Sequence, residues 1–122
     1  RCARADAQKP AILIIQLVWV KMFISGKKRY EIRSQATTKR GERIYIAASG
    51  TSAIYATATV TDCIGPLTQT QWKQMREGHC VPDAQRYYGE STYAWVLSDV
   101  EPIWPTIPFN RKPGAIIWQR GF

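Results

Sequence analysis

The sequence predicts an α+β fold, a small, closed or nearly closed mixed β-barrel of about five to six short strands with two or three short helices. Short β-branched or alternating stretches recur along the chain, and two stretches change to helical spacing. At 122 residues and 45% hydrophobic content, the chain is long enough for one modest core. We therefore expect a single domain over residues 11–122, preceded by an N-terminal extension over residues 1–10.

The domain is predicted to begin with a buried strand and a short helix. Residues 11–16 read AILIIQ, a short β-branched run that is typical of a buried strand. From residue 17 to residue 25, side chains recur at helical spacing, which indicates a short helix or turn. Gly26 follows at the position of a helix C-cap, where we expect a positive φ.

The next strand is predicted over residues 29–34, RYEIRS, and it carries charges on one face. Because successive side chains of a strand point to opposite sides, Tyr30 and Ile32 share one face, and Glu31 and Arg33 share the other. The alternation therefore predicts a half-buried strand with a charged pair on its second face.

Two more strands follow a turn at residues 37–42, TTKRGE. They are RIYIAAS at residues 43–49 and AIYATATVTDCI at residues 53–64. The longer strand alternates threonines with small apolar residues, and this pattern suits a tightly curved sheet.

Helical spacing then returns in LTQTQWKQMREGH, residues 67–79, with Thr68 or Thr70 as the N-cap and Gly78 as the end of the helix. The stretch VPDAQRYYG at residues 81–89 predicts a weaker second helix or a turn.

The C-terminal part of the chain is predicted to return to strands. STYAWVLSDV, at residues 91–100, is a strand that places three side chains on one face: Tyr93, Trp95 and Leu97. EPIWPTIPFNRKPG, at residues 101–114, holds four prolines, so we expect an ordered loop or an edge rather than a central strand. AIIWQ, at residues 115–119, is predicted to be the last strand.

Positive charge is concentrated in residues 26–43, which contribute +5 to a net charge of +8. This stretch has two acids, Glu31 and Glu42, and seven basic residues, Lys27, Lys28, Arg29, Arg33, Lys39, Arg40 and Arg43. A cationic face of this kind favours a polyanionic partner. The alternative is a solvated surface hairpin, because clustering in the sequence does not by itself build a patch in space.

The cysteines and the single histidine argue against a metal site or a disulfide framework, and we expect no cofactor. Cys2, Cys63 and Cys80 are odd in number and form no CxxC pair, which favours a reducing, cytoplasmic location. His79 lacks the partner spacing of a zinc site, and we expect it at a helix end, where its protonated form favours the dipole. The longest apolar run is too short to span a membrane, and no secretory signal is visible.

Four residues, Gly26, Lys28, Glu31 and Arg33, spell GxKxxExR. This resembles the signature of the ASCH (activating signal cointegrator homology) domain family, whose fold is a PUA-like barrel. Four further collinear segments resemble that family: GERIYIAAS, TATVTDCIGPLT, YAWVLSDVEPI and PGAIIW. The resemblance covers the chain from about residue 12 to residue 118.

The resemblance implies a cleft lined by the motif and a link to RNA or nucleotide handling. Some small bacterial members of the family are amidohydrolases that deacetylate acetylcytidine, with a lysine, a threonine and a glutamate. Lys28 matches the lysine, but Glu31 stands at the position of the threonine, which removes the proposed nucleophile. The glutamate on the helix after the Asp-Cys strand corresponds to Glu77.

The chemistry of the motif residues favours a ligand over a purely structural role. Lys28 carries a flexible ammonium group, and Arg33 offers a fork of donors to a phosphate or carboxylate. Cations around Glu31 should lower the pKa of its carboxyl, which makes it an acceptor for an exocyclic amine or a Watson–Crick N–H. The alternative is an ion pair of Glu31 with Lys28 or Arg33 that only locks the strand.

Aromatic side chains near the motif are candidates for stacking on a base. Tyr93 and Trp95 share a strand face, and Trp19 and Tyr30 flank the motif, although core packing is the alternative for Trp95. The predicted binding residues are therefore Gly26, Lys27, Lys28, Glu31, Arg33, Arg40, Tyr93 and Trp95.

Three functions remain open at this point, and the sequence leaves the oligomeric state undetermined. The first is binding of RNA, of a nucleotide or of a modified nucleoside in the cleft. The second is hydrolysis of a nucleoside or of RNA, as an amidohydrolase or a ribonuclease. The third is a protein-interaction or regulatory domain that presents Trp104 and Phe109 to a partner. We rank binding first because the threonine of the amidohydrolases is missing.

For the hydrolase, the candidate catalytic residues are Lys28, Glu31 and Glu77. Lys28 would act as a base or as an electrostatic stabiliser, and one of the glutamates would assist it. A lysine does acid–base work when its pKa is lowered, and the sequence places Lys27 and Arg29 beside it as cationic neighbours.

Overall fold

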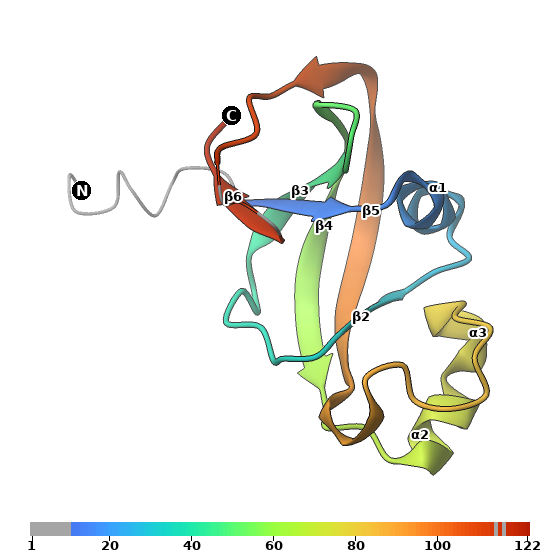
Figure 1. The fold of residues 1–122 in the computed structure, drawn as a ribbon. Helices are drawn as coiled ribbons and strands as arrows, with labels where there is room; N and C mark the ends of the chain where they lie inside the picture. The colour runs from blue at the N-terminus through green and yellow to red at the C-terminus, as the bar shows by residue number, and fades with distance from the viewer. Residues whose placement is uncertain (1–10, 114, 116) are drawn as a thin grey trace.

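A computed structural model describes residues 11–113, 115 and 117–122. The elements are β1 (Ala11–Ile15), α1 (Leu17–Ser25), β2 (Tyr30–Arg33), β3 (Arg43–Ala48), β4 (Ala53–Ile64), α2 (Gln69–Gln74), α3 (Arg76–His79), the 3-10 turn η2 (Gly89–Ser91), β5 (Tyr93–Pro108) and β6 (Trp118–Arg120). The strands form one curled sheet in the order β2-β5-β4-β3-β1-β6, with the helices beside it (Figure 1). β1 is parallel to β3 and the other pairs are antiparallel, so the predicted α+β mixed architecture is confirmed.

The curled sheet is not closed by a pairing of its two edge strands. β2 lies at one edge and β6 at the other, and within the described ranges neither strand is paired with the other. β6 begins at Trp118, later than the predicted start of the last strand at residue 115. Residue 116 and the predicted N-terminal extension lie outside the described residues.

The buried strand and the short helix at the start of the domain form as predicted. All five residues of β1 are buried between β3 and β6. α1 follows at once and buries Val20 and Phe23 against the sheet. Gly26 ends the helix with a φ of 85°, a left-handed conformation that glycine adopts without steric cost. The turn at Gly26 leads the chain through Lys28 into β2.

β2 is short and pairs with β5, where Glu31 lies opposite Trp95 and Ile32 lies opposite Ala94. Both central residues of this strand, Glu31 and Ile32, are buried. The predicted half-buried strand is therefore wrong in one respect: the face that carries Glu31 is covered, and only its neighbour Arg33 stays partly exposed.

β4 and β5 form a long antiparallel pair of 12 and 16 residues. We expected residues 101–114 to form an ordered loop or an edge of the sheet. β5 continues to Pro108, so over residues 101–108 the expectation of a loop is wrong and that of an edge is correct. β2 pairs with β5 only as far as Val96, and beyond that point β5 has β4 as its partner in the described chain. Proline lacks an N–H donor, and it is tolerated where one side of the strand is free.

The insertion between β4 and β5 begins with the predicted cap. The hydroxyl of Thr68 accepts the N–H of Gln71 at 3.0 Å, and the side chain of Gln71 accepts the N–H of Thr68 at 2.8 Å. This reciprocal pair is a capping box that satisfies two free donors of the first turn. The predicted single helix is then interrupted at Met75, which separates α2 from α3.

Gly78 lies inside α3 rather than at the end of the helix, which continues to His79 and ends at Cys80 in a left-handed conformation. A Cβ on Gly78 would lie 2.4 Å from the Cε2 atom of Tyr30, so glycine is needed for the close approach of α3 to β2. The stretch from residue 81 to residue 88 contains no helix, so the predicted turn is correct there and the predicted helix is wrong.

Apolar side chains fix the insertion next to the open edge of the sheet. One cluster packs α2 against β2 and β5: Ile32, Leu67, Trp72, Val81 and Ala94. The largest cluster fills the space between α1 and the concave sheet, with Leu13, Phe23, Ile46 and Leu97 among its buried members. None of the helices in the described part of the chain has the length and apolar character needed to cross a membrane.

Replacing Gly78 with alanine tests this close packing. At an ordinary position inside a helix, a glycine-to-alanine change raises the free energy of unfolding by up to ~1 kcal/mol. We expect the opposite for Gly78→Ala, a loss of about 1–3 kcal/mol in the free energy of unfolding, because the new methyl group would overlap the ring of Tyr30. Urea denaturation measures this, and the loss should shrink in a Tyr30→Ala background. A Gly78→Ala variant as stable as the wild type would contradict the packing.

Candidate functional site

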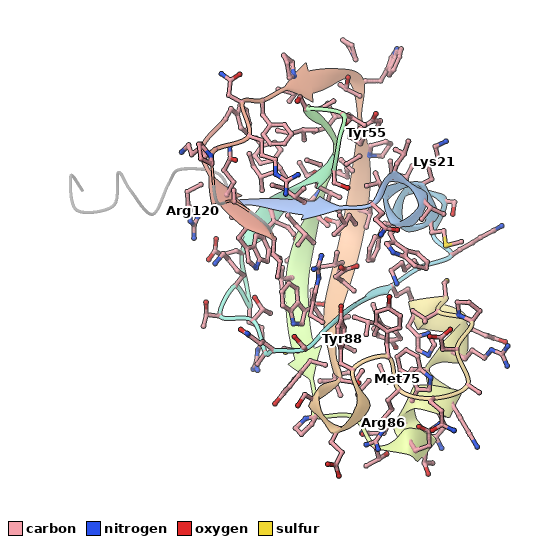
Figure 2. The ribbon with its side chains drawn as sticks, viewed as in Figure 1. Lys21, Tyr55, Met75, Arg86, Tyr88 and Arg120 are labelled. Carbon is pink, nitrogen blue, oxygen red and sulfur yellow. The ribbon has the colours of Figure 1, made fainter. Side chains whose placement is uncertain are left out.

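A cavity of about 260 Å³ opens beside β2, between the start of α1 and the segment that follows α3. Three charged residues of the GxKxxExR motif line it: Lys28, Glu31 and Arg33. We call it the motif cavity. Apart from Gln16, its other walls are apolar or hydroxylic and include Ile14, Trp19, Ser49, Val81, Tyr87 and Tyr88. Figure 2 shows Tyr88 next to β2, on the chain segment between α3 and β5.

Lys28 is 2% exposed, and its ammonium group is held by protein atoms from three directions. It donates a hydrogen bond to the carbonyl oxygen of His79. It also lies over the ring of Trp19, 4.5 Å from the centroid, and 5.6 Å from the ring centroid of Phe23. Burial lowers the pKa of Lys28, and the nearby Glu31 opposes part of that shift. The predicted direction is correct, but burial is the main cause, with Arg33 rather than Lys27 and Arg29 as the cationic neighbour.

Glu31 is buried beside two cations, and one of its oxygens is already bound. Its Oε2 atom accepts a hydrogen bond from the Nε atom of Arg33 at 2.8 Å. Burial raises the pKa of Glu31, while Arg33 and Lys28 oppose the rise. The predicted fall in this pKa is therefore wrong, because the loss of water around the carboxylate outweighs the favourable charges.

Two sets of polar atoms at the site remain open to a ligand. The second oxygen of Glu31 has no hydrogen bond to the described residues, and every fully buried side-chain N or O atom there has a partner. This oxygen therefore reaches the cavity. The terminal nitrogens of Arg33 likewise have no hydrogen-bond partner in the described chain, and its side chain is 19% exposed. The site thus offers an acceptor and a planar fork of donors side by side.

His79 is neutral and buried, and the hydrogen bonds of its ring fix the residue whose backbone carbonyl oxygen binds Lys28. The N–H of Val81 donates to its Nδ1 at 2.9 Å, so the ring proton is on Nε2, which donates to the carbonyl oxygen of Trp72 at 2.9 Å. The ring also stacks on Trp72 at 3.8 Å. Burial lowers the pKa of His79. It does lie at the end of a helix as predicted, but the prediction that it acts there as a protonated group is wrong.

Trp19, one of the predicted stacking candidates, lines the motif cavity, but the other aromatic walls differ from those predicted. Tyr93 packs against the main core, and Trp95 is buried there with its indole N–H donating to the carbonyl oxygen of Gln35 at 2.8 Å. Neither lines the motif cavity. Tyr87 and Tyr88 take this place, and the sequence signal for them was two adjacent tyrosines in a turn-rich stretch. Burial raises the pKa of Tyr88, so its hydroxyl stays a neutral donor.

The remaining predicted site residues are dispersed. Gly26 forms the turn before the motif, and Lys27 is exposed outside the cavity. Arg40 lies 3.7 Å from Asp62 in an exposed ion pair. Glu77 is exposed on α3 and does not line the motif cavity.

The basic residues of the stretch over residues 26–43 have different surroundings. Arg43 lies on the exposed surface of the sheet, where its guanidinium donates to Thr57, to Thr59 and to Glu101 at 2.8–3.0 Å. Lys28 and Arg33 face the motif cavity. Some of the predicted concentration of charge therefore faces a cavity, and some of it is used in ion pairs with neighbouring strands and turns.

Two other predictions concern the cysteines and a pair of aromatic residues. Cys63 and Cys80 are free thiols, and Cys2 lies outside the described residues. In the described ranges, no group of three or more His, Cys, Asp or Glu side chains is arranged to hold a metal ion. Trp104 is 88% exposed, as a partner surface requires, but Phe109 is buried and cannot be presented with it.

Three crystal structures of the ASCH protein from Zymomonas mobilis are similar to this chain. A serine-to-alanine variant has a TM-score of 0.74 and 22% identity over 93% of this chain and 89% of its own. A tyrosine-to-phenylalanine variant has a TM-score of 0.73 and 22% identity over 93% and 91%. A further ASCH structure from that organism has a TM-score of 0.67 and 23% identity over 84% and 73%. At this identity the likeness concerns the fold, and it confirms the predicted PUA-like architecture.

No curated protein matches the chain. The model of the ASCH domain family matches residues 13–106, which include all four residues of the GxKxxExR motif and most of the curled sheet. The chain therefore belongs to the ASCH domain family.

Proposed function

We propose that this domain binds RNA, or a modified nucleotide within RNA, and that the motif cavity receives one nucleobase. The observation that carries the proposal is the convergence of Lys28, Glu31 and Arg33 on one hollow of about 260 Å³. Proteins recognise RNA sequence mostly on unpaired bases, which they stack on aromatic rings and read along the hydrogen-bonding edge. The family resemblance, which implies RNA or nucleotide handling, supports the same partner.

The polar atoms of the site match the edge of a base. The free oxygen of Glu31 can accept an exocyclic amine or a ring N–H. The terminal nitrogens of Arg33 and the remaining protons of the Lys28 ammonium can donate to a ring nitrogen, a carbonyl oxygen or a phosphate. Because these groups are fixed by the protein before the ligand arrives, little ordering is needed on binding.

Aromatic rings are available to cover the face of the base. Tyr87 and Tyr88 are 57% and 39% exposed, and Trp19 stands at the opposite element, α1. Stacking of a base on an aromatic side chain contributes roughly 1–3 kcal/mol. We therefore expect stacking and edge recognition, rather than a broad cationic face, to supply most of the affinity.

Two adjacent lysines provide a matched test of this site. Lys28→Met removes the buried ammonium, whereas Lys27→Met makes the same change at an exposed position outside the cavity. Hydrogen bonds to charged groups contribute about 1.5–3 kcal/mol, so Lys28→Met should weaken RNA binding roughly 10-fold or more. Lys27→Met should change it by less than about threefold. Titration of labelled single-stranded RNA, at two salt concentrations, measures both.

A third variant guards against a folding defect in Lys28→Met. Tyr88→Ala removes an exposed ring from the wall of the cavity, and it should weaken binding while circular dichroism and the unfolding midpoint stay close to the wild type. The proposal is contradicted if wild-type protein shows no RNA binding at low salt, or if the Lys27 and Lys28 variants bind equally well.

A second candidate, hydrolysis of a nucleoside or of RNA, is favoured by one observation. Lys28 and Glu31 are buried together, and burial shifts both pKa values toward the neutral forms. A neutral lysine can accept a proton from water that attacks an acyl group, and a charged one can stabilise the resulting oxyanion. We rank this candidate second because Glu31 stands where the amidohydrolases have a threonine, and Glu77 lies away from the cavity.

Incubation with acetylcytidine and with RNA separates catalysis from binding. If the second candidate holds, wild-type protein releases cytidine or shortened RNA, and Lys28→Ala lowers the rate by roughly 100-fold or more, as loss of a general base does. Equal turnover by both proteins would remove Lys28 from the chemistry. Absence of any product with either substrate would leave binding as the function.

The lowered pKa of Lys28 also predicts a pH dependence of stability. The folded protein releases the Lys28 proton at a lower pH than the unfolded chain, whose value is near 10.5. Between those two pKa values the unfolded state binds more protons, so the free energy of unfolding should rise with pH. This alkaline rise should be present in wild type and Lys27→Met and absent from Lys28→Met. The free energy of unfolding is measured by denaturation at several pH values. If it changes with pH in the same way in all three proteins, the pKa of Lys28 is not lowered.

A further inference from the structure

A second cavity, of about 330 Å³, adjoins the motif cavity where the curled sheet stays open. We call it the edge cavity. It is lined by Arg33 at the end of β2, by Trp118 on β6 and by the loop over residues 34–39. Because β2 and β6 are the two edge strands of the sheet, this hollow lies between the unjoined edges. The incomplete closure of the barrel thus creates a space rather than a packed seam.

The two cavities share part of their walls. Arg33 and Tyr88 line both of them, so a ligand in one would stand directly beside a ligand in the other. Arg33 is fixed at this border because its Nε atom is bound to Glu31. Its terminal nitrogens, which have no hydrogen-bond partner in the described chain, are the donors of a bidentate contact to phosphate.

The edge cavity is held in shape by contacts to the core. The indole N–H of Trp95 donates to the carbonyl oxygen of Gln35 at 2.8 Å, and the ring of Trp95 stacks on Trp118 at 5.7 Å. Within the loop, the N–H of Lys39 donates to the hydroxyl of Thr37 at 3.1 Å. The ammonium group of Lys39 lies 4.8 Å from the ring centroid of Trp118. The wall therefore combines the rings of Trp95 and Trp118, a cation and loop hydroxyls at fixed positions.

Size and chemistry together suggest a ligand longer than one nucleoside. Each cavity alone is near the lower limit of the ~300–1,000 Å³ typical of small-molecule sites, and the pair together reaches well into that range. A cation and aromatic rings lining a groove are the features with which proteins hold successive nucleotides of a single strand.

We propose that the site binds a two-nucleotide step of single-stranded RNA. One base enters the motif cavity, the neighbouring nucleotide occupies the edge cavity, and the phosphate that links them lies at Arg33. Lys39 and Trp118 then contact the second nucleotide. The inference rests on the proposed function and adds the length of the ligand and the place of its second unit.

The test compares ligands that differ by one nucleoside but carry the same number of phosphates. The probes are the four nucleoside 5′-monophosphates and the sixteen dinucleoside monophosphates, titrated by calorimetry into wild-type protein. The monophosphates carry the higher negative charge, so any preference for the longer ligand cannot come from charge alone. We expect the best dinucleotide to bind about 10-fold more tightly than either of its mononucleotides, as an added stacking contact provides.

Variants in the edge cavity identify the contact that produces this preference. Lys39→Gln should weaken dinucleotide binding several-fold and leave mononucleotide binding unchanged. Thr38→Trp, which adds bulk to an exposed loop position lining the cavity, should do the same by filling the space. The matched control is Lys21→Gln, an exposed lysine on α1 outside both cavities (Figure 2). It should affect neither class of ligand.

The outcomes separate this inference from the proposed function. If wild-type protein binds mononucleotides and dinucleotides equally well, and Lys39→Gln and Thr38→Trp change neither, the two-nucleotide site is overturned while the proposed function stands. If no nucleotide and no RNA binds, the proposed function itself fails. A dinucleotide preference that disappears in both edge-cavity variants and persists in Lys21→Gln supports the inference.

Discussion

The buried ammonium group of Lys28 is the constraint on which the site depends. A charge removed from water is costly unless protein groups replace its hydration. Here the carbonyl oxygen of His79 accepts a hydrogen bond from it, the rings of Trp19 and Phe23 lie beside it, and the negative charge of Glu31 favours its protonated form. These groups come from α1, β2 and α3, so the position of one nitrogen atom links two consecutive elements to a helix that lies much later in the chain. Loss of any of them would leave the ammonium without a partner or open the cavity.

The fold brings these groups together around Lys28 because the sheet is curled but not closed. β2 has a sheet partner on one side only within the described chain, and its other side faces the space where the insertion packs. The short α3 helix ends at His79, which directs a backbone carbonyl at Lys28, and Gly78 allows this helix to approach Tyr30 closely. A fully closed barrel would fill both hollows with sheet hydrogen bonds and side chains. The open edge is therefore the structural reason that a binding site can exist here.

The sequence was sufficient for the architecture and for the choice of three charged residues that the structure brings together around one cavity, because strand alternation and the GxKxxExR spacing are local signals. It was not sufficient for properties that depend on burial. The pKa of Glu31 was predicted with the wrong sign, since neighbouring charges are visible in a sequence and the loss of water is not. Alternation placed Tyr93 and Trp95 on one strand face, but it could not show that Tyr93 packs against the core while Trp95 is buried there and also lines the edge cavity. Tyr88 escaped notice because the position of an irregular segment is set by tertiary packing.

The central claim is that a nucleobase enters the motif cavity beside Lys28, and tryptophan indole resonances test it most directly. Trp19 lines this cavity, whereas Trp104 is exposed and lines none of the hollows described here. In a ¹H–¹⁵N spectrum recorded during titration with single-stranded RNA, the indole N–H signal of Trp19 should shift with saturation and that of Trp104 should stay in place. A shift of Trp104 with an unmoved Trp19 would show that RNA binds elsewhere and would contradict the account.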